Sequence, residues 1–107
     1  MKFNRIFLIV CDSMGIGNAK DAKKYNDFGT NTVGHICSIC DGLNIPTLQN
    51  LGFGNLGDFK GVAKTQNPQA YILKLNEASN GKDTMTGHWE MMGLKTEKPF
   101  IIFSIFV

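Results

Sequence analysis

Apolar residues form an uninterrupted run near the start of the chain. Residues 6–11 read Ile-Phe-Leu-Ile-Val-Cys, without polar alternation. Such a short run, rich in strand-favouring side chains, is typical of a central parallel strand covered on both faces. Asp12 ends the run and opens a turn-rich segment that continues through Gly17. Because ligands gather at the carboxyl ends of strands in open α/β sheets, Asp12 is well placed for chemistry.

A helical pattern follows at residues 31–41. Apolar side chains recur there at positions i, i+3, i+4 and i+7, with Thr30 or Asn31 available as a cap and Gly42 just beyond the end. This spacing predicts an amphipathic helix. The apolar positions are Val33, Ile36, Cys37 and Cys40.

Two shorter helices and one more strand are expected farther along. Pro46 opens a helix over residues 47–51 that Gly52 closes, and a strand is expected at residues 70–75. Asp83 can cap a helix that runs from near Thr84 to near Gly93. Together with the first apolar run, these elements predict an α/β fold in which helices flank a parallel sheet.

Composition narrows the class of protein. The chain has 107 residues, enough for one small domain, and 43% of them are hydrophobic, so a core is expected. Eleven basic and nine acidic residues leave a formal charge of +2 without a block of one sign, which gives no support for a nucleic-acid or membrane partner. No secretory signal is recognisable, and three cysteines fit reduced thiols, so we expect a cytoplasmic protein.

The cysteines suggest a second class of function. Cys37 and Cys40 form a C-x-x-C pattern that, with Cys11 and His35, could belong to a small zinc or thiol module. No second ligand pair follows at metal spacing, and both thiols share the apolar stripe of the predicted helix. Packing in the core is therefore the favoured interpretation of this pair.

Residues 52–57 spell the G-x-G-x-x-G pattern of dinucleotide-binding proteins. The pattern is informative only between a strand and a helix, and this copy follows a predicted helix instead. We interpret it as a loop in which glycine supplies positive φ angles.

Asp12 and Thr84 form a plausible pair for metal-assisted phosphoryl transfer. A carboxylate at a strand end offers hard oxygen ligands to a divalent cation, and a cation activates a nearby hydroxyl while shielding an incoming phosphate. A helix N-terminus adds amide donors at the same place. Considered alone, however, Asp12 is equally well explained as a turn residue, and Thr84 as a helix cap.

Four segments in order resemble the phosphopentomutase family, metal-dependent enzymes of the alkaline phosphatase superfamily. Residues 82–93, Lys-Asp-Thr-Met-Thr-Gly-His-Trp-Glu-Met-Met-Gly, resemble the segment that carries the family's nucleophile. The other three are residues 12–17, 29–36 and 51–55, and the likeness extends over about residues 3 to 100. The resemblance implies a partial alkaline-phosphatase-like core, with residues 1–107 as the N-terminal portion of its metal-binding domain.

The resemblance also implies an activity and its residues. Family members interconvert the 1-phosphates and 5-phosphates of ribose and deoxyribose, usually with two Mn²⁺ ions, through a phosphorylated threonine that Thr84 matches. Asp12 matches a metal-binding aspartate of the first strand, and Thr84 also faces the metal. Three further residues are candidates for orienting the nucleophile and the metal ligands without binding the metal, namely Lys82, Asp83 and His88. A solvated lysine, a helix cap and a packed histidine explain them equally well.

The sequence departs from the family in length and in its tail. Family members are several-fold longer, and the Asp and His residues that complete their metal site lie near the far C-terminus. Residues 101–107 leave the family pattern and form an aggregation-prone apolar window. We therefore expect a partial or frameshifted reading frame whose 107 residues lack mutase activity and fold poorly alone. Another phosphomutase or phosphatase of the superfamily is the alternative among enzymes.

Overall fold

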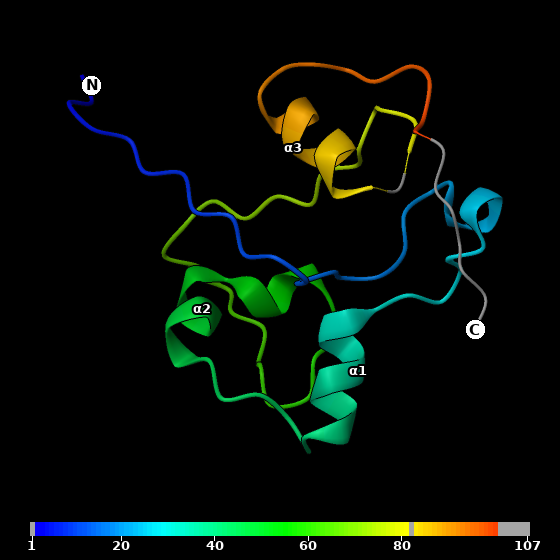
Figure 1. Cartoon of the computed structure of the whole chain (residues 1–107). Helices are drawn as coiled ribbons and strands as arrows, with labels where there is room; N and C mark the ends of the chain where they lie inside the picture. Colours follow the sequence, from blue (N-terminus) through cyan, green and yellow to red (C-terminus); the bar gives the residue numbers. More distant parts are fainter. Residues whose placement is uncertain (1, 82, 101–107) are drawn as a thin grey trace. The chain divides into compact units, whose positions relative to one another are not determined.

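The computed structural model describes residues 2–81 and 83–100. Contacts divide these residues into two compact units, residues 2–18 with 29–72, and residues 19–28 with 73–81 and 83–100. The helical elements of the described chain, shown in Figure 1, are η1 (Ala22–Tyr25), α1 (Thr32–Ile39), α2 (Pro46–Leu51), η2 (Phe53–Leu56) and α3 (Thr84–Met91), where η marks a 3-10 helix.

Helix α1 begins where its cap predicts. The side chain of Asn31 accepts a hydrogen bond from the amide of Gly34 at 3.2 Å, which satisfies one of the free amides of the first turn. The helix ends at Ile39, with Cys40 as its C-cap, two residues short of the predicted end. The prediction of a helix over residues 31–41 is confirmed.

Helix α2 is bounded by a proline and a glycine. Pro46 occupies the first position, where its missing amide hydrogen costs nothing, and Gly52 ends the helix with a φ of 108°. The amide of Gly52 caps the carbonyls of Leu48 and Gln49. The prediction for residues 47–51 is confirmed, and Gly52 has the positive φ expected from the loop interpretation of residues 52–57.

The core of the first unit joins α1 to the segment after η2. Val33 and Cys37 from α1 are buried together with Phe59 and Val62. Partly buried apolar residues surround this cluster, namely Ile16, Leu43, Ile45, Phe53 and Leu56. The buried stripe of α1 is narrower than the sequence predicts, because Ile36 remains 42% exposed and Cys40 is exposed at the helix end.

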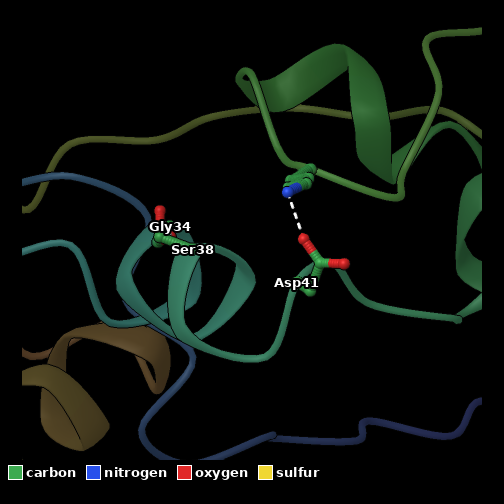
Figure 2. Close-up of polar contacts among 4 residues, drawn as sticks. Gly34, Ser38 and Asp41 are labelled. Atoms are coloured by element: carbon green, nitrogen blue, oxygen red, sulfur yellow. Dashed lines mark hydrogen bonds and ion pairs between the residues drawn. The ribbon is translucent and has the colours of Figure 1, made fainter.

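A tight reversal holds this core closed. Phe59 and Val62 form an isolated antiparallel bridge, and the Leu43 amide donates to the Lys60 carbonyl at 3.0 Å. Figure 2 shows the end of α1, where Asp41 forms an ion pair with Lys60. Both side chains are largely exposed, so this ion pair stabilises the reversal little and the main-chain contacts carry more of it.

The expected strands are absent from the described residues. Residues 6–11 and 70–75 form no strand, and most of their apolar side chains are exposed, with Ile6 at 83%, Ile9 at 82% and Leu75 at 85%. A strand needs a neighbour for its backbone amides and carbonyls. The described part of the chain provides no such neighbour for either segment, so the predicted parallel sheet is not confirmed.

The buried residues around α3 in the second unit have small side chains, two of them polar. Thr86 is fully buried, Ser79 is 5% exposed and Ala22 is 4% exposed. Trp89 contacts the edge of Phe100, with ring centroids 5.4 Å apart.

The predicted helix from Thr84 is confirmed. The predicted tail at residues 101–107 lies outside the described residues. Over residues 2–81 and 83–100, no helix has the length and apolar character needed to cross a membrane.

Candidate active site

Asp12 lies in an exposed turn after the first apolar run. Its Oδ1 atom accepts the amide of Ser13 at 2.9 Å, and Ser13 has a positive φ of 58°. The following segment is tied to α1, because the Gly17 amide donates to Oδ1 of Asn31 at 3.1 Å. These contacts hold the turn against the N-terminus of α1 and leave the Asp12 carboxylate accessible to a cation.

Asn31 has a role in this turn that the sequence pattern did not reveal. One oxygen, Oδ1, accepts the amides of both Gly17 and Gly34. A Cβ atom at Gly34 would lie 2.1 Å from Nδ2 of Asn31, so glycine is required for the side chain to fold over the helix start. The sequence showed Asn31 only as a candidate cap, because its bond to Gly17 spans 14 residues.

Thr84 is the first residue of α3, and its side chain is exposed. Asp83 caps the helix with both carboxylate oxygens. Oδ1 accepts the Thr86 amide at 2.9 Å, and Oδ2 accepts the Thr86 hydroxyl at 2.5 Å. Because Thr86 is fully buried, this pair anchors the first turn and presents the neighbouring Thr84 hydroxyl outward.

The cap remains ionised in this arrangement. The hydroxyl of Thr86 is the main cause that holds the pKa of the Asp83 carboxyl below its usual range, and the Thr86 amide lowers it further. The structure therefore supports the interpretation of Asp83 as a cap. Its carboxylate is engaged with Thr86 rather than with the Thr84 hydroxyl.

His88 contacts the main chain of Thr84. Its Nδ1 atom lies 2.7 Å from the Thr84 carbonyl oxygen. A carbonyl only accepts, so Nδ1 carries the hydrogen, and Nε2 is the acceptor in the neutral ring. His88 therefore braces the first turn of α3 from its exposed face, in keeping with an ordering role beside Thr84.

Glu90, which the sequence did not single out, joins α3 to the preceding segment. Its Oε1 atom accepts the Ala78 amide at 2.8 Å, and Oε2 accepts the Ser79 amide at 2.6 Å. The pKa of the Glu90 carboxyl is lowered, mainly by Ala78 and next by Ser79. The two hydrogen bonds span 12 and 11 residues, so no local sequence motif predicts them.

Four carboxylates of the second unit influence one another electrostatically. The pKa of Glu77 is raised, first because its carboxyl loses surrounding water and next because of the charge on Glu90. Asp21 and Asp83 contribute in the same direction.

The predicted site residues are divided between the two units. Thr84, Asp83 and His88 belong to the second unit and Asp12 to the first, so the approach of the Asp12 carboxylate to the Thr84 hydroxyl stays a prediction. Lys82 lies outside the described residues. The exposed carboxylate and hydroxyl are hard oxygen donors, which fit Mg²⁺ or Mn²⁺ in kind. Within residues 2–81 and 83–100, no group of three or more His, Cys, Asp or Glu residues could hold a metal.

The alternative function, a small zinc or thiol module, is not favoured. Cys37 is 1% exposed within the apolar cluster, where the sequence predicted core packing for it. Cys40 was expected in the core as well, but it is exposed because the helix ends there. Cys11 and His35 are also exposed and contribute to no metal group among the described residues.

An open pocket of about 480 Å³ occurs in the first unit, away in sequence from every predicted site residue. Lys60 and Lys64 at its wall are already paired with Asp41 and Asp58. The hydrogen bond from Lys64, and next its charge, hold the pKa of the Asp58 carboxyl below its usual range. The pocket lining comprises Gly57, Asp58, Phe59, Lys60, Val62 and Lys64.

Comparison with known proteins identifies the class. Residues 4–98 match the Metalloenzyme superfamily, and the chain belongs to that superfamily. The alkaline-phosphatase-like part of the fold prediction is thereby supported, as is the use of a divalent metal. Over 103 residues, the chain is 55% identical to the phosphopentomutase of Clostridium tetani (strain Massachusetts / E88). This match covers 96% of the chain and 26% of that relative, so the chain spans about a quarter of the relative's length.

Proposed function

We propose that the protein to which this chain belongs is a phosphopentomutase. It interconverts the 1-phosphates and 5-phosphates of ribose and deoxyribose through a phosphorylated Thr84 at a two-metal site. The observation that supports this most is the 55% identity to a phosphopentomutase over 103 residues, a stretch that includes the capped helix start of Thr84. On this proposal residues 1–107 are the N-terminal portion of a metal-binding core domain in a cytoplasmic enzyme.

The geometry around Thr84 suits a nucleophile that gains and loses a phosphoryl group. Its hydroxyl is exposed at the first position of α3, where the positive end of the helix dipole favours a phosphate. The carboxylate of Asp83 accepts the Thr86 hydroxyl, and Nδ1 of His88 donates to the Thr84 carbonyl. The first turn is thus fixed while the hydroxyl stays available.

A divalent metal, with Mn²⁺ proposed, would be held by Asp12 and Thr84 together with further ligands. When bound, it lowers the pKa of the hydroxyl and shields the charge of the sugar phosphate. Each ion takes about four to six coordination positions, which Asp12 and Thr84 cannot fill. We therefore expect the 107 residues by themselves to show no mutase turnover.

The test is an assay of the complete protein with ribose 1-phosphate and Mn²⁺. We expect conversion to ribose 5-phosphate, and a peptide containing Thr84 that is heavier by one phosphate. Thr84→Ala should abolish both, and Thr84→Ser should retain part of each. Thr47→Ala is the matched control, because Thr47 is also exposed in the first turn of a helix, α2.

Two results would contradict the proposal. Full turnover by Thr84→Ala would remove Thr84 as the nucleophile. A wild-type enzyme that converts phosphoglycerate but not pentose phosphates would assign the protein to another phosphomutase of the superfamily. Turnover by the purified 107-residue chain would contradict only the expectation that these residues hold too few metal ligands for activity.

A further inference from the structure

One carboxylate in α3 holds two consecutive amides of a distant segment. Glu90, in the last turn, accepts the amide of Ala78 at 2.8 Å and the amide of Ser79 at 2.6 Å, each with a different oxygen. Hydrogen bonds to an ionised acceptor are roughly twice as strong as neutral ones. Glu90 therefore fixes the position and the direction of the main chain at residues 78–79.

The same segment is held from its other side. The Thr96 amide donates to Oγ of Ser79 at 2.9 Å, and the Asn80 amide donates to the Thr96 carbonyl at 2.8 Å. Nδ2 of Asn80 donates to the Glu97 carbonyl at 2.9 Å. Ser79 is only 5% exposed, so its bond to Thr96 is partly shielded from water, and the three bonds together restrict the movement of residues 79–80.

The held segment packs directly against the cap of α3. Gly81 is buried, and a Cβ atom built there would lie 3.0 Å from Oγ1 of Thr86 and 3.2 Å from Oδ2 of Asp83. The main chain at Gly81 thus meets the two groups whose hydrogen bond fixes the first turn. A shift of residues 78–81 would be transmitted to the cap and to the adjacent Thr84.

We propose that Glu90 is a positioning residue for the Thr84 hydroxyl, acting through residues 78–81 and the pair formed by Asp83 and Thr86. This inference rests on the proposed function of Thr84. It follows from the contacts because Glu90 holds the amides of Ala78 and Ser79, and this segment continues to Gly81, which packs against the cap of α3. Misplacing a reacting group by about 1 Å can cost a factor of about 100 in rate.

The experiment compares two substitutions of the same type in the complete, Mn²⁺-loaded protein. Glu90→Gln keeps the side-chain length but presents an amide group to one of the two main-chain donors. Glu97→Gln is the control, because Glu97 meets Asn80 through its main-chain carbonyl. For Glu90→Gln we expect kcat to fall about tenfold or more, with KM for ribose 5-phosphate changed by less than about twofold. The control should match wild type.

A second readout is independent of turnover. Amide hydrogen exchange should quicken at residues 78–79 and 83–86 in Glu90→Gln, and not in Glu97→Gln. If Glu90→Gln does not fold, Glu90→Asp provides the same comparison, since it keeps the charge but is too short to reach both amides. Failure of both variants to fold would overturn the inference by showing a purely structural role.

The outcomes separate this inference from the proposed function. A folded Glu90→Gln with wild-type kcat and only a lower melting temperature would overturn the positioning role and leave the mutase assignment intact. A wild-type protein without pentose phosphate turnover would overturn the mutase assignment, and the positioning role would fall with it. Reduced kcat together with faster exchange at residues 83–86 would support the inference.

Discussion

Substitution of Gly81 by alanine should damage both the stability of α3 and the phosphorylation of Thr84. Gly81 has a φ of 143°, a conformation that side chains rarely adopt, and such strain costs about 1–3 kcal/mol. The added Cβ would also lie 3.0 Å from Oγ1 of Thr86, inside ordinary contact distance. Close packing of this kind adds about 1 kcal/mol or more, for a total of about 2–4 kcal/mol.

Gly93→Ala is the matched control on the other end of the helix. Gly93 also has a positive φ, 93°, but a Cβ atom there meets nothing within 4 Å among the described residues. Its cost is therefore backbone strain alone, about 1–2 kcal/mol. The difference between the two variants contains the contact of Gly81 with the helix cap and the difference in strain between the two φ angles.

The assay is native-state hydrogen exchange of α3 in the complete protein, combined with mass analysis of the Thr84 peptide. Both variants should open α3 more readily, Gly81→Ala by the larger amount, and only Gly81→Ala should lose phosphorylated Thr84. Equal opening free energies together with equal phosphorylation in the two variants would refute the idea that Gly81 supports the cap.

Three further outcomes are expected. Thr86→Val removes the hydroxyl that is the main cause of the lowered pKa of Asp83. A pKa that is lower in the folded than in the unfolded protein stabilises the fold at pH values above the unfolded pKa. Because the variant loses this stabilisation, its acid unfolding should begin at higher pH. Glu77→Gln should raise the urea midpoint at pH 7 and leave it unchanged well below pH 4, because the raised pKa makes only the charged form unfavourable. In thiol titration of the native protein, Cys40 should react at once and Cys37 only after unfolding; prompt reaction of Cys37 would contradict its burial.

The helices were predictable from sequence because their signals are local. Asn31, Pro46 and Asp83 each occupy the cap or first position that the sequence indicated, and the observed starts agree with the predicted ones. A cap and its amide donor are three residues apart at Asn31 and at Asp83. Interactions over such short separations involve few residues, so a short stretch of sequence is enough to predict them.

The supports of the site were less predictable because they join distant positions. Glu90 reaches residues 11 and 12 positions earlier, and Asn31 reaches Gly17 across 14. Neither side chain differs in type from an ordinary surface glutamate or a helix cap. Only the fold that places Ala78 and Ser79 beside the last turn of α3 reveals that Glu90 accepts both amides.

The difference between helix and strand also explains which half of the proposed site is already built. A helix satisfies its backbone within its own segment, so the first turn of α3 and its cap at Asp83 form from residues close to Thr84 in sequence. Residues 6–11 need neighbouring strands before their backbone is paired, and Asp12 follows directly after them. The approach of the Asp12 carboxylate to the Thr84 hydroxyl therefore stays a prediction, whereas the exposed position of Thr84 at the start of α3 is observed.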